Sequence, residues 1–527
     1  MPLFFKEKKE RILIFGTGSG GVGFYKSFRG KYKIVGFLDN NNKKHGETLF
    51  GYKIYPPENI SSLDFNKIYI ASDYYIEIYE QLTVTLGVDE NNIEIFHSGS
   101  ETGISSVEKI EKWLERHYYS SICHSSSMLS KILFFMLFFK KHGRKNVKLV
   151  HFDWLDNRVD LRVHTFRDAV AGCVVGPLYI GRPQPIAQIT LPKIALYHFR
   201  NGCISSVSRS VLLPDDRFVI ERVESADIYN ADYSCARLIY HGKKLAIIRK
   251  DTAEYIEKGI LINGGSETNY YHWMLEILSQ LQFVQELPEK YDDYPILISS
   301  FSQKIAAVNM FIDNAGINRK FVFINNASYY QVGDLLMITP PNNLVPNLRN
   351  TSWSHVVNSY VRLESLKYLR EIAFKSIKNK DGSSSPKRVF LARKNFIRKY
   401  NQDEIIKSLS QFDFSFIYME DLEFHEQVYI MSRAELIVGP TGAAWTNILF
   451  ATSGAKALCW MASEAGDLSC FSNIASALDV KLNYINYCAG ESDTRSIYYA
   501  PYKIDVNIIV DWVRHHIYES LSSNLGR

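Results

Sequence analysis

Short apolar strands that run into glycine-rich turns and then into helices constrain the fold of this chain most strongly. The clearest case is the strand at residues 11–15 (RILIF), which leads into the turn GTGSGGVG at residues 16–23 and a helix expected to end near Phe28. Further apolar strands are expected at residues 32–38, 67–71, 93–96, 259–262, 295–299, 321–324, 388–392 and 435–438. Strands that alternate with helices pair as parallel βαβ units. The sequence therefore predicts an α/β protein.

Changes in composition divide the chain into several parts. A length of 527 residues is too great for one hydrophobic core, so more than one domain is expected. We expect a nucleotide-binding-like domain over residues 1–100, a helical connector over 101–150, and two lobes over 151–380 and 381–527. The last boundary follows the Gly/Ser-rich stretch KDGSSSP. Residues 170–250 are rich in β-branched residues, which favours strands there.

Composition and charge narrow the class of protein. The chain has 46% hydrophobic and 22% charged residues, which is ordinary for a globular protein. A net charge of +5 is too small an excess, in so long a chain, to indicate nucleic acid as a partner. The 7 cysteines include neither a CxxC pair nor a metal-binding spacing. We therefore expect no disulfide framework, no metal site and a cytoplasmic location.

An apolar segment followed by positive charges leaves two interpretations open. Residues 132–139 (ILFFMLFF) precede Lys140, Lys141, Arg144 and Lys145. They are too few to span a bilayer, which takes about 18 apolar residues. The segment suits peripheral contact with the anionic inner face of a membrane. It suits equally a buried helix that packs one domain against another, with the lysines in solvent.

A histidine and a glutamate occupy neighbouring turns of an expected helix. They are His272 and Glu276, in the segment NYYHWMLE that begins at Asn269. Side chains at this spacing share one helix face, and together they could accept a proton from a substrate hydroxyl. A structural pair beside the core would show the same spacing.

Two segments in the last part of the chain are suited to bind an anion. Residues 438–447 (VGPTGAAWTN) place small residues between an apolar strand and a helix, where free N–H groups and the helix dipole favour a phosphate. Close packing of the helix on the sheet would require the same small residues. Arg393 and Arg398 follow another strand and could neutralise a diphosphate, although such cations also mark solvated strand edges.

The first glycine-rich turn has the GxGxxG pattern of dinucleotide-binding domains. Gly16, Gly18 and Gly21 lie between a strand and a helix, and Asp39 closes the second strand, where an acidic residue would meet a ribose. The domain either binds NAD or another nucleotide, or is a structural unit. No YxxxK motif occurs within residues 1–100, which argues against hydride transfer there.

The segments NYYHWMLEIL, RVFLARKNFIRKYNQDEI and EFHEQVYIMSRAELIVGPTGAAWTNILF, in this order, resemble glycosyltransferase family 61, also called the DUF563 family. The resemblance covers about residues 255–460. It implies a GT-B fold with two Rossmann-like lobes facing across a cleft, a nucleotide-sugar donor, inversion at the anomeric carbon and no metal requirement. The domain in front is similar to NAD- and nucleotide-sugar-binding Rossmann domains attached to bacterial glycan enzymes.

The resemblance also implies roles for single residues. His272 and Glu276 match the His and acidic residue on the helix that lines the cleft, and we take them as catalytic. The positions expected to bind the donor are Arg393, Arg398, Asn401, Glu426, Gln427, Gly439, Thr441, Gly442, Ala443 and Asn447. Many members have His where this chain has Thr441, which can offer only a hydroxyl.

The function that follows is transfer of a sugar to a growing surface polysaccharide, such as capsule or lipopolysaccharide, or to a lipid-linked glycan. The enzyme would work in the cytoplasm, or peripherally at the inner face of the membrane. Two alternatives stay open: a sugar-nucleotide oxidoreductase or epimerase driven by residues 1–100, and a non-catalytic glycan-binding protein.

Overall fold

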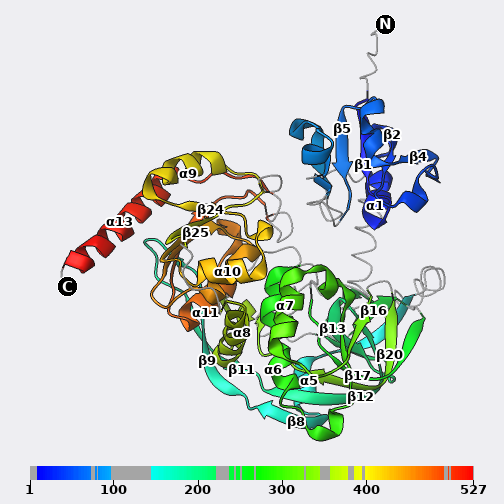
Figure 1. Ribbon diagram of the computed structural model, residues 1–527. Coiled ribbons are helices and arrows are strands. Elements are labelled where there is room, and N and C mark those ends of the chain that lie inside the picture. Colours follow the sequence, from blue (N-terminus) through cyan, green and yellow to red (C-terminus); the bar gives the residue numbers. More distant parts are fainter. Residues whose placement is uncertain are drawn as a thin grey trace. The chain divides into compact units, whose positions relative to one another are not determined.

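The computed structural model divides into two compact units, Met1–Tyr118 and Tyr119–Arg527 (Figure 1). It describes residues 9–72, 78–79, 81–96, 144–220, 237–242, 245–249, 252–265, 269–325, 328–344, 356–377, 385–394, 398–491, 497 and 500–525.

The first unit is built on a 6-stranded sheet in the order β3-β4-β2-β1-β5-β6. Its elements are β1 (Arg11–Phe15), α1 (Ser19–Phe28), β2 (Lys33–Leu38), β3 (Thr48–Leu49), β4 (Tyr52–Tyr55), β5 (Lys67–Ile70) and β6 (Ile93–Ile95). All neighbours from β4 to β6 pair in parallel, and β3 and β4 form an antiparallel hairpin. Ile12 and Ile14 pack with Phe24 of α1, whereas Leu13 and Phe15 pack on the opposite face, because side chains alternate along a strand.

The second unit begins with an 11-stranded mixed sheet, which we call the first lobe (residues 144–377). Its strands are β7 (Arg144–His151), β8 (Arg162–Arg167), β12 (Ile194–Ser205), β13 (Ser208–Leu212), β14 (Arg217–Ile220), β15 (Leu238–His241), β16 (Leu245–Arg249), β17 (Ala253–Leu261), β18 (Ile296–Ser299), β19 (Phe321–Ile324) and β20 (Tyr329–Ile338). The strands β20-β17-β18-β19 are parallel. Most other pairs are antiparallel, so this sheet is not the wholly parallel one that a Rossmann-like lobe would have.

Helices cover the parallel part of this sheet. They are a π-helical turn η6 (His272–Ile277), which continues as η7 (Leu278–Gln280) and α6 (Leu281–Val284), then α7 (Ala306–Ala315) and α8 (Leu363–Lys375). A shorter helix, α5 (Phe152–Asp156), follows β7. Every residue of η6 is buried, including its histidine and glutamate.

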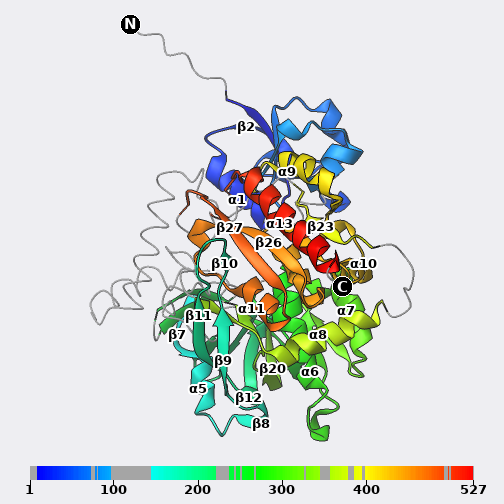
Figure 2. The same ribbon diagram turned by 90° about the vertical axis from the view of Figure 1, so that its left-hand side faces the viewer.

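The second lobe (residues 385–525) is built on a 6-stranded sheet in the order β10-β27-β26-β25-β23-β24, with all neighbours parallel. Its strands are β23 (Arg388–Leu391), β24 (Ser415–Ile417), β25 (Leu436–Pro440), β26 (Lys456–Ala462) and β27 (Lys481–Tyr487). Its helices are α9 (Gln402–Leu409), α10 (Phe424–Met431), the 3-10 helix η13 (Ala443–Phe450), α11 (Cys470–Ala477) and α13 (Val506–Leu525). α9 and α13 pack on one face, in front of the strands in Figure 2, and α10, η13 and α11 pack on the other.

An arm of the first lobe completes the sheet of the second. The strands β9 (Val170–Val175) and β11 (Ile186–Leu191) pair as an antiparallel ribbon, and β10 (Leu178–Tyr179) between them adds to β27 in parallel (Figure 2). The Val175 N–H also donates to Asn473 Oδ1 at 2.7 Å.

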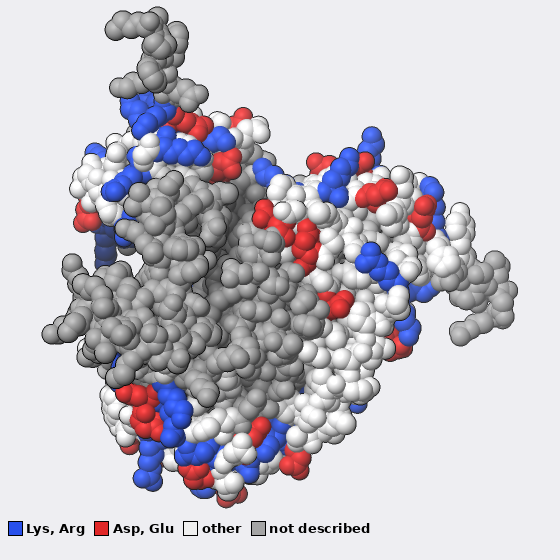
Figure 3. Space-filling view, turned by 180° about the vertical axis from the view of Figure 1, so that it is seen from behind, with Lys and Arg blue, Asp and Glu red and all other residues white. Residues whose placement is uncertain are grey.

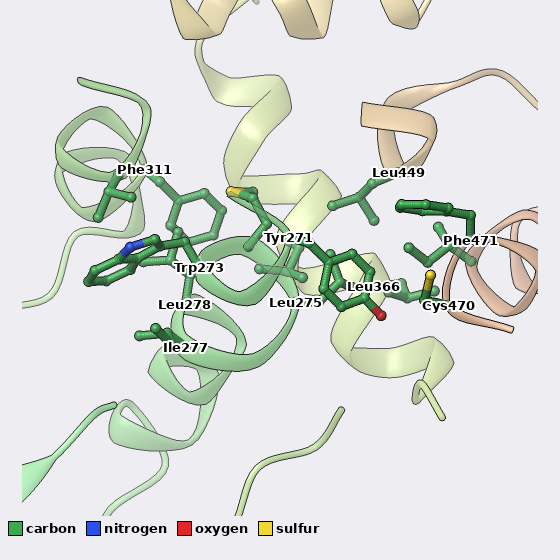
Figure 4. Packing of buried hydrophobic residues seen from close by; sticks show 14 of the residues in the cluster. Tyr271, Trp273, Leu275, Ile277, Leu278, Phe311, Leu366, Leu449, Cys470 and Phe471 are labelled. Carbon is green, nitrogen blue, oxygen red and sulfur yellow. The ribbon is translucent and has the colours of Figure 1, made fainter. Parts of the chain in front are cut away.

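One hydrophobic core runs through both lobes. Leu275 of η6 and Leu366 of α8 belong to the same buried cluster as Leu449 and Phe471 of the second lobe (Figure 4). The ring of Tyr271 packs edge-on against Phe471, with centroids 5.8 Å apart. The two lobes therefore meet through packed side chains beside η6.

The strands expected from the sequence are confirmed, although β17 begins six residues before the expected start at 259, and so are the end of α1 at Phe28 and the β-rich character of the described part of residues 170–250. One expectation was wrong in part. Residues 144–150 of the expected helical connector form β7, which pairs with β14 and β16. Arg144 and Lys145 therefore lie in a strand, and the segment 132–139 with Lys140 and Lys141 lies outside the described residues.

Two surface properties bear on partners. Within the described part of the chain, the helices are each too short or too polar to cross a bilayer. On the face in Figure 3, Lys and Arg side chains lie interspersed with Asp and Glu over the described surface.

Candidate active site

A buried histidine–glutamate pair lies on η6. His272 is 5% exposed and Glu276 is 1% exposed. His272 Nδ1 and Glu276 Oε2 are 2.7 Å apart, and Leu344 N–H donates to Glu276 Oε1 at 2.6 Å. π-helical turns occur often at functional sites. The spacing of His272 and Glu276 is compatible with a structural pair or a catalytic pair, and in the structure the two side chains are in direct contact.

An arginine that the sequence analysis missed completes this cluster. Arg209, on β13, is 3% exposed, and its Nη2 lies 3.8 Å from Glu276 Oε2 and 3.3 Å from Asn343 Oδ1. The only sequence signal for it is a lone charge between Ser208 and Ser210 in a β-rich region.

The surroundings of Glu276 decide its charge. Burial, the largest influence, acts to raise the pKa of the carboxyl, but the charges of Arg209 and His272 and the hydrogen bonds to it together hold this pKa below its ordinary value. An ionised carboxylate only accepts hydrogen bonds, so Nδ1 of His272 carries the proton. In the neutral ring Nε2 is then the acceptor, and no described residue makes a hydrogen bond to it.

A hydrogen-bonded chain joins this segment to the second lobe. Tyr270 OH donates to Asn447 Oδ1 at 3.1 Å, and Asn447 Nδ2 donates to Gln427 Oε1 at 3.1 Å. Gln427 in turn donates to the carbonyls of Met419 and Leu422. Segments of both lobes therefore meet at the fully buried Asn447.

Both expected arginines reach the glycine-rich turn after β25. Arg393 Nη2 donates to the carbonyl of Thr441, and Arg398 Nη1 lies 3.5 Å from the same oxygen. A Cβ at Gly442 would lie 3.0 Å from Arg393 Nη2, so glycine lets the guanidinium approach the backbone. Arg398 has a φ of +49°, which is unusual for a residue with a long side chain.

The remaining residues of this turn have packing roles. A Cβ at Gly439 would lie 2.8 Å from the Leu391 carbonyl oxygen, so glycine allows β25 to lie close to β23. Ala443 begins η13. Thr441 presents its carbonyl to the arginines.

Two other expected donor ligands are engaged within the protein. Asn401 Nδ2 donates to the Ile504 carbonyl at 3.0 Å, and Ile504 N–H donates back to Asn401 Oδ1 at 2.9 Å. Glu426 accepts the Glu423 N–H at 3.0 Å in a capping box at the start of α10. Neither contact involves Arg393 or Arg398. A donor-binding role for Asn401 and Glu426 stays a prediction.

The three glycines of the GxGxxG pattern differ in whether the local structure requires a glycine at that position. Gly16 has a φ of +113°, and a Cβ at Gly21 would lie 1.9 Å from the Gly16 carbonyl oxygen, so a tight turn and close packing require these two. A Cβ at Gly18 would meet no atom within 4 Å. Asp39 accepts from Thr17 and lies 3.2 Å from Lys44 Nζ. Although burial acts to raise the pKa of Asp39, these contacts hold it below its ordinary value.

A buried histidine–glutamate pair and an arginine-bound turn are groups that a group-transfer enzyme can use as a proton acceptor and as cations. Among the described residues, no three or more His, Cys, Asp or Glu side chains group as a metal site would require. Residues 270–458, which carry the His272 segment, the arginines and the glycine-rich turn, match the family described as Glycosyltransferase 61. This match supports glycosyltransferase activity.

Residues 8–94 match a different family, described as C2185-like, N-terminal. The NAD-type identity expected for the first unit is not confirmed by this match. No curated protein matches the chain. Among solved structures, UDP-D-quinovosamine 4-dehydrogenase from Vibrio fischeri is similar at 22% identity over 17% of this chain and 76% of its own, with a TM-score of 0.14. A similarity of this size carries no inference about fold or function.

Proposed function

We propose that the protein is an inverting glycosyltransferase of the GT-B type that transfers a sugar from a nucleotide-sugar donor to a glycan acceptor without a metal ion. The observation that carries this proposal is the hydrogen bond from Tyr270 to Asn447. It joins the segment that holds the buried His272–Glu276 pair to the helix that follows the arginine-bound turn. This link supports a shared site in which the proton acceptor and the cations act on one displacement.

His272 acts as the general base in this proposal. Its Nε2 takes the proton of the acceptor hydroxyl while the acceptor oxygen forms a bond to the anomeric carbon and the bond from that carbon to the leaving phosphate breaks. Glu276 keeps the proton on Nδ1 and stabilises the imidazolium that forms. Arg209 keeps Glu276 ionised, so Glu276 orients the base and stays unprotonated itself.

The leaving nucleoside diphosphate is met by the second lobe. Arg393 and Arg398 share the carbonyl of Thr441. Phosphate oxygens are stronger acceptors for a guanidinium than a neutral carbonyl, so a diphosphate would take over these donors together with the N–H groups at the start of η13.

The acceptor and the place in the cell are proposed from the sequence alone. A surface polysaccharide or lipid-linked glycan built at the cytoplasmic face suits the cationic segment at 132–145. Flotation with anionic liposomes tests the membrane contact. Binding that weakens with salt and on Lys140→Glu/Lys141→Glu supports it, and no binding at low salt contradicts it.

A nucleotide bound by the first unit is a second proposal. Gly18 is the one glycine of GxGxxG that packing leaves unexplained, and in that pattern the second glycine lets the backbone approach a pyrophosphate. Binding of NAD to the purified protein would favour the oxidoreductase or epimerase alternative. Retained transfer without any bound dinucleotide would contradict it.

A thermal-shift screen of UDP-, GDP-, CMP- and dTDP-sugars tests the transferase proposal. A donor stabilises the folded state by mass action, and the shift should disappear in Arg393→Ala. A shift that survives in this variant would assign the nucleotide to another site. No shift with any donor would favour the non-catalytic glycan-binding alternative.

A further inference from the structure

Arg393 lies one residue beyond the point where its strand stops pairing. The ladder between β23 and β24 ends with the Ala392 N–H, which donates to the Ile417 carbonyl at 2.8 Å. The next backbone groups, those of Arg393, would need partners outside the sheet.

The side chain of Gln402 supplies both partners. Arg393 N–H donates to Gln402 Oε1 at 2.9 Å, and Gln402 Nε2 donates to the Arg393 carbonyl at 2.9 Å. Gln402 is 3% exposed and is the first residue of α9, yet its amide does not cap that helix. It pairs with Arg393 as a neighbouring strand would.

Tyr400 fixes the amide of Gln402 in turn. Its hydroxyl donates to Gln402 Oε1 at 2.6 Å. Its ring is 5% exposed, stacks on Tyr502 at a centroid distance of 5.3 Å and packs edge-on against Trp460. The amide therefore has one orientation, with its oxygen toward two donors and its nitrogen toward a carbonyl.

We infer that Gln402, held by Tyr400, is a positioning residue that aims the Arg393 guanidinium at the glycine-rich turn where a diphosphate is bound. The inference rests on the proposed function. The side chain of Gln402 makes no hydrogen bond to the carbonyl of Thr441. It acts only through the backbone of Arg393. A shift of that backbone moves the guanidinium. A misplaced guanidinium loses the paired N–H hydrogen bonds that a phosphate accepts.

Binding of inorganic pyrophosphate to the full-length protein, followed by calorimetry, tests the inference without knowledge of the sugar or the base. The relevant site is defined as the component that Arg393→Ala abolishes. Gln402→Met keeps the volume but removes three hydrogen bonds, and we expect it to weaken this component at least about tenfold. Tyr400→Phe, which removes one hydroxyl and is the milder test of folding, should weaken it by about two- to fourfold.

A matched control separates positioning from general loss of stability. Asn473 is also a buried amide of the second lobe with a backbone donor and a backbone acceptor, but it holds Val175 and Ser359 rather than Arg393. Asn473→Leu should lower the thermal midpoint and leave pyrophosphate affinity unchanged.

A double-mutant cycle gives a measurement that a structural role would not affect. Lysine cannot donate the paired hydrogen bonds of a guanidinium. In an Arg393→Lys background, Gln402→Met should therefore weaken pyrophosphate binding by much less than in the wild type. An equal loss in both backgrounds, or unchanged affinity in folded Gln402→Met and Tyr400→Phe, would overturn the inference and leave the proposed donor site intact. Absence of an Arg393-dependent component in the wild type would overturn the donor site, and the inference with it.

Discussion

Tyr270 of the first lobe donates a 3.1 Å hydrogen bond to Asn447 of the second lobe, 177 positions further along the chain. Asn447 is fully buried and passes the contact on to Gln427. The bond fixes the start of η6, which carries the proposed base, relative to the helix η13 that follows the glycine-rich turn. The core that runs through both lobes at this point supports the same arrangement (Figure 4).

Loss of this bond should affect turnover more than donor binding. Tyr270→Phe removes only the hydroxyl, and one hydrogen bond contributes about 1 kcal/mol, so we expect turnover to fall by about fivefold. Diphosphate affinity should stay within about twofold, because the arginines are untouched. Steady-state kinetics and calorimetry measure the two effects. Tyr271→Phe, in a ring that packs against Phe471, is the control, and an equal loss in that variant would contradict the role of the bond.

The two members of the buried pair should contribute unequally. His272→Ala removes the base and should lower turnover more than about a hundredfold while the donor still binds. Glu276→Gln can still accept from Nδ1–H but loses the charge, so its loss should be smaller. Single-turnover kinetics with bound donor give both values. The reverse order, with the larger loss in Glu276→Gln, would assign the base to Glu276.

The lowered pKa of Glu276 makes a prediction for stability. Because the folded state holds this pKa below the ordinary 4.5, the unfolded chain takes up the proton first as the pH falls. The stabilisation from the ionised carboxylate is thus complete above the ordinary glutamate pKa and is lost as the pH falls from there through the folded value. Urea unfolding of the wild type and Glu276→Gln should show a difference that shrinks over this range. A constant difference would contradict the assignment.

Arg398 should separate stability from binding. Its φ of +49° is one that glycine adopts without steric cost, and strain of this kind amounts to about 1–3 kcal/mol. Arg398→Gly should therefore keep or raise the free energy of unfolding while pyrophosphate affinity falls at least about fivefold. Denaturant unfolding and calorimetry on the same sample check this. A clear loss of stability with unchanged affinity would make Arg398 a structural residue.

The strands and the glycine-rich turns could be predicted because each depends on only a few consecutive residues. Arg388–Leu391 and Phe321–Ile324 are short apolar runs bounded by turn residues, and they form β23 and β19. The pairing order could not be predicted, since β10 pairs with β27, whose residues lie 305 positions further along the chain. The strand β7 was missed because its charged beginning, Arg144–Lys145, follows a strongly apolar run that suggested a helix.

For the candidate site, the sequence predicted which residue types matter but not how they are partnered. His272 and Glu276 could be paired from their spacing, whereas Arg209 comes close to them only through the β12–β13 turn. Asn401 and Glu426 looked equivalent to Arg393 in a motif, but their side chains are engaged with backbone groups nearby. These hydrogen bonds depend on tertiary contacts, which a local sequence pattern does not show.

Release of free nucleotide from sugar donors tests whether this protein is a metal-independent glycosyltransferase. The purified protein is mixed with UDP-, GDP-, dTDP- and CMP-sugars in the presence of EDTA, with water as the acceptor of the sugar, and free nucleotide is measured over time. We expect release from one donor. Release should be at least about tenfold slower in Arg393→Ala, because a charge-assisted hydrogen bond to the diphosphate is lost, and nearly absent in His272→Ala. Release from no donor, or equal release by all three proteins, would contradict the proposed function.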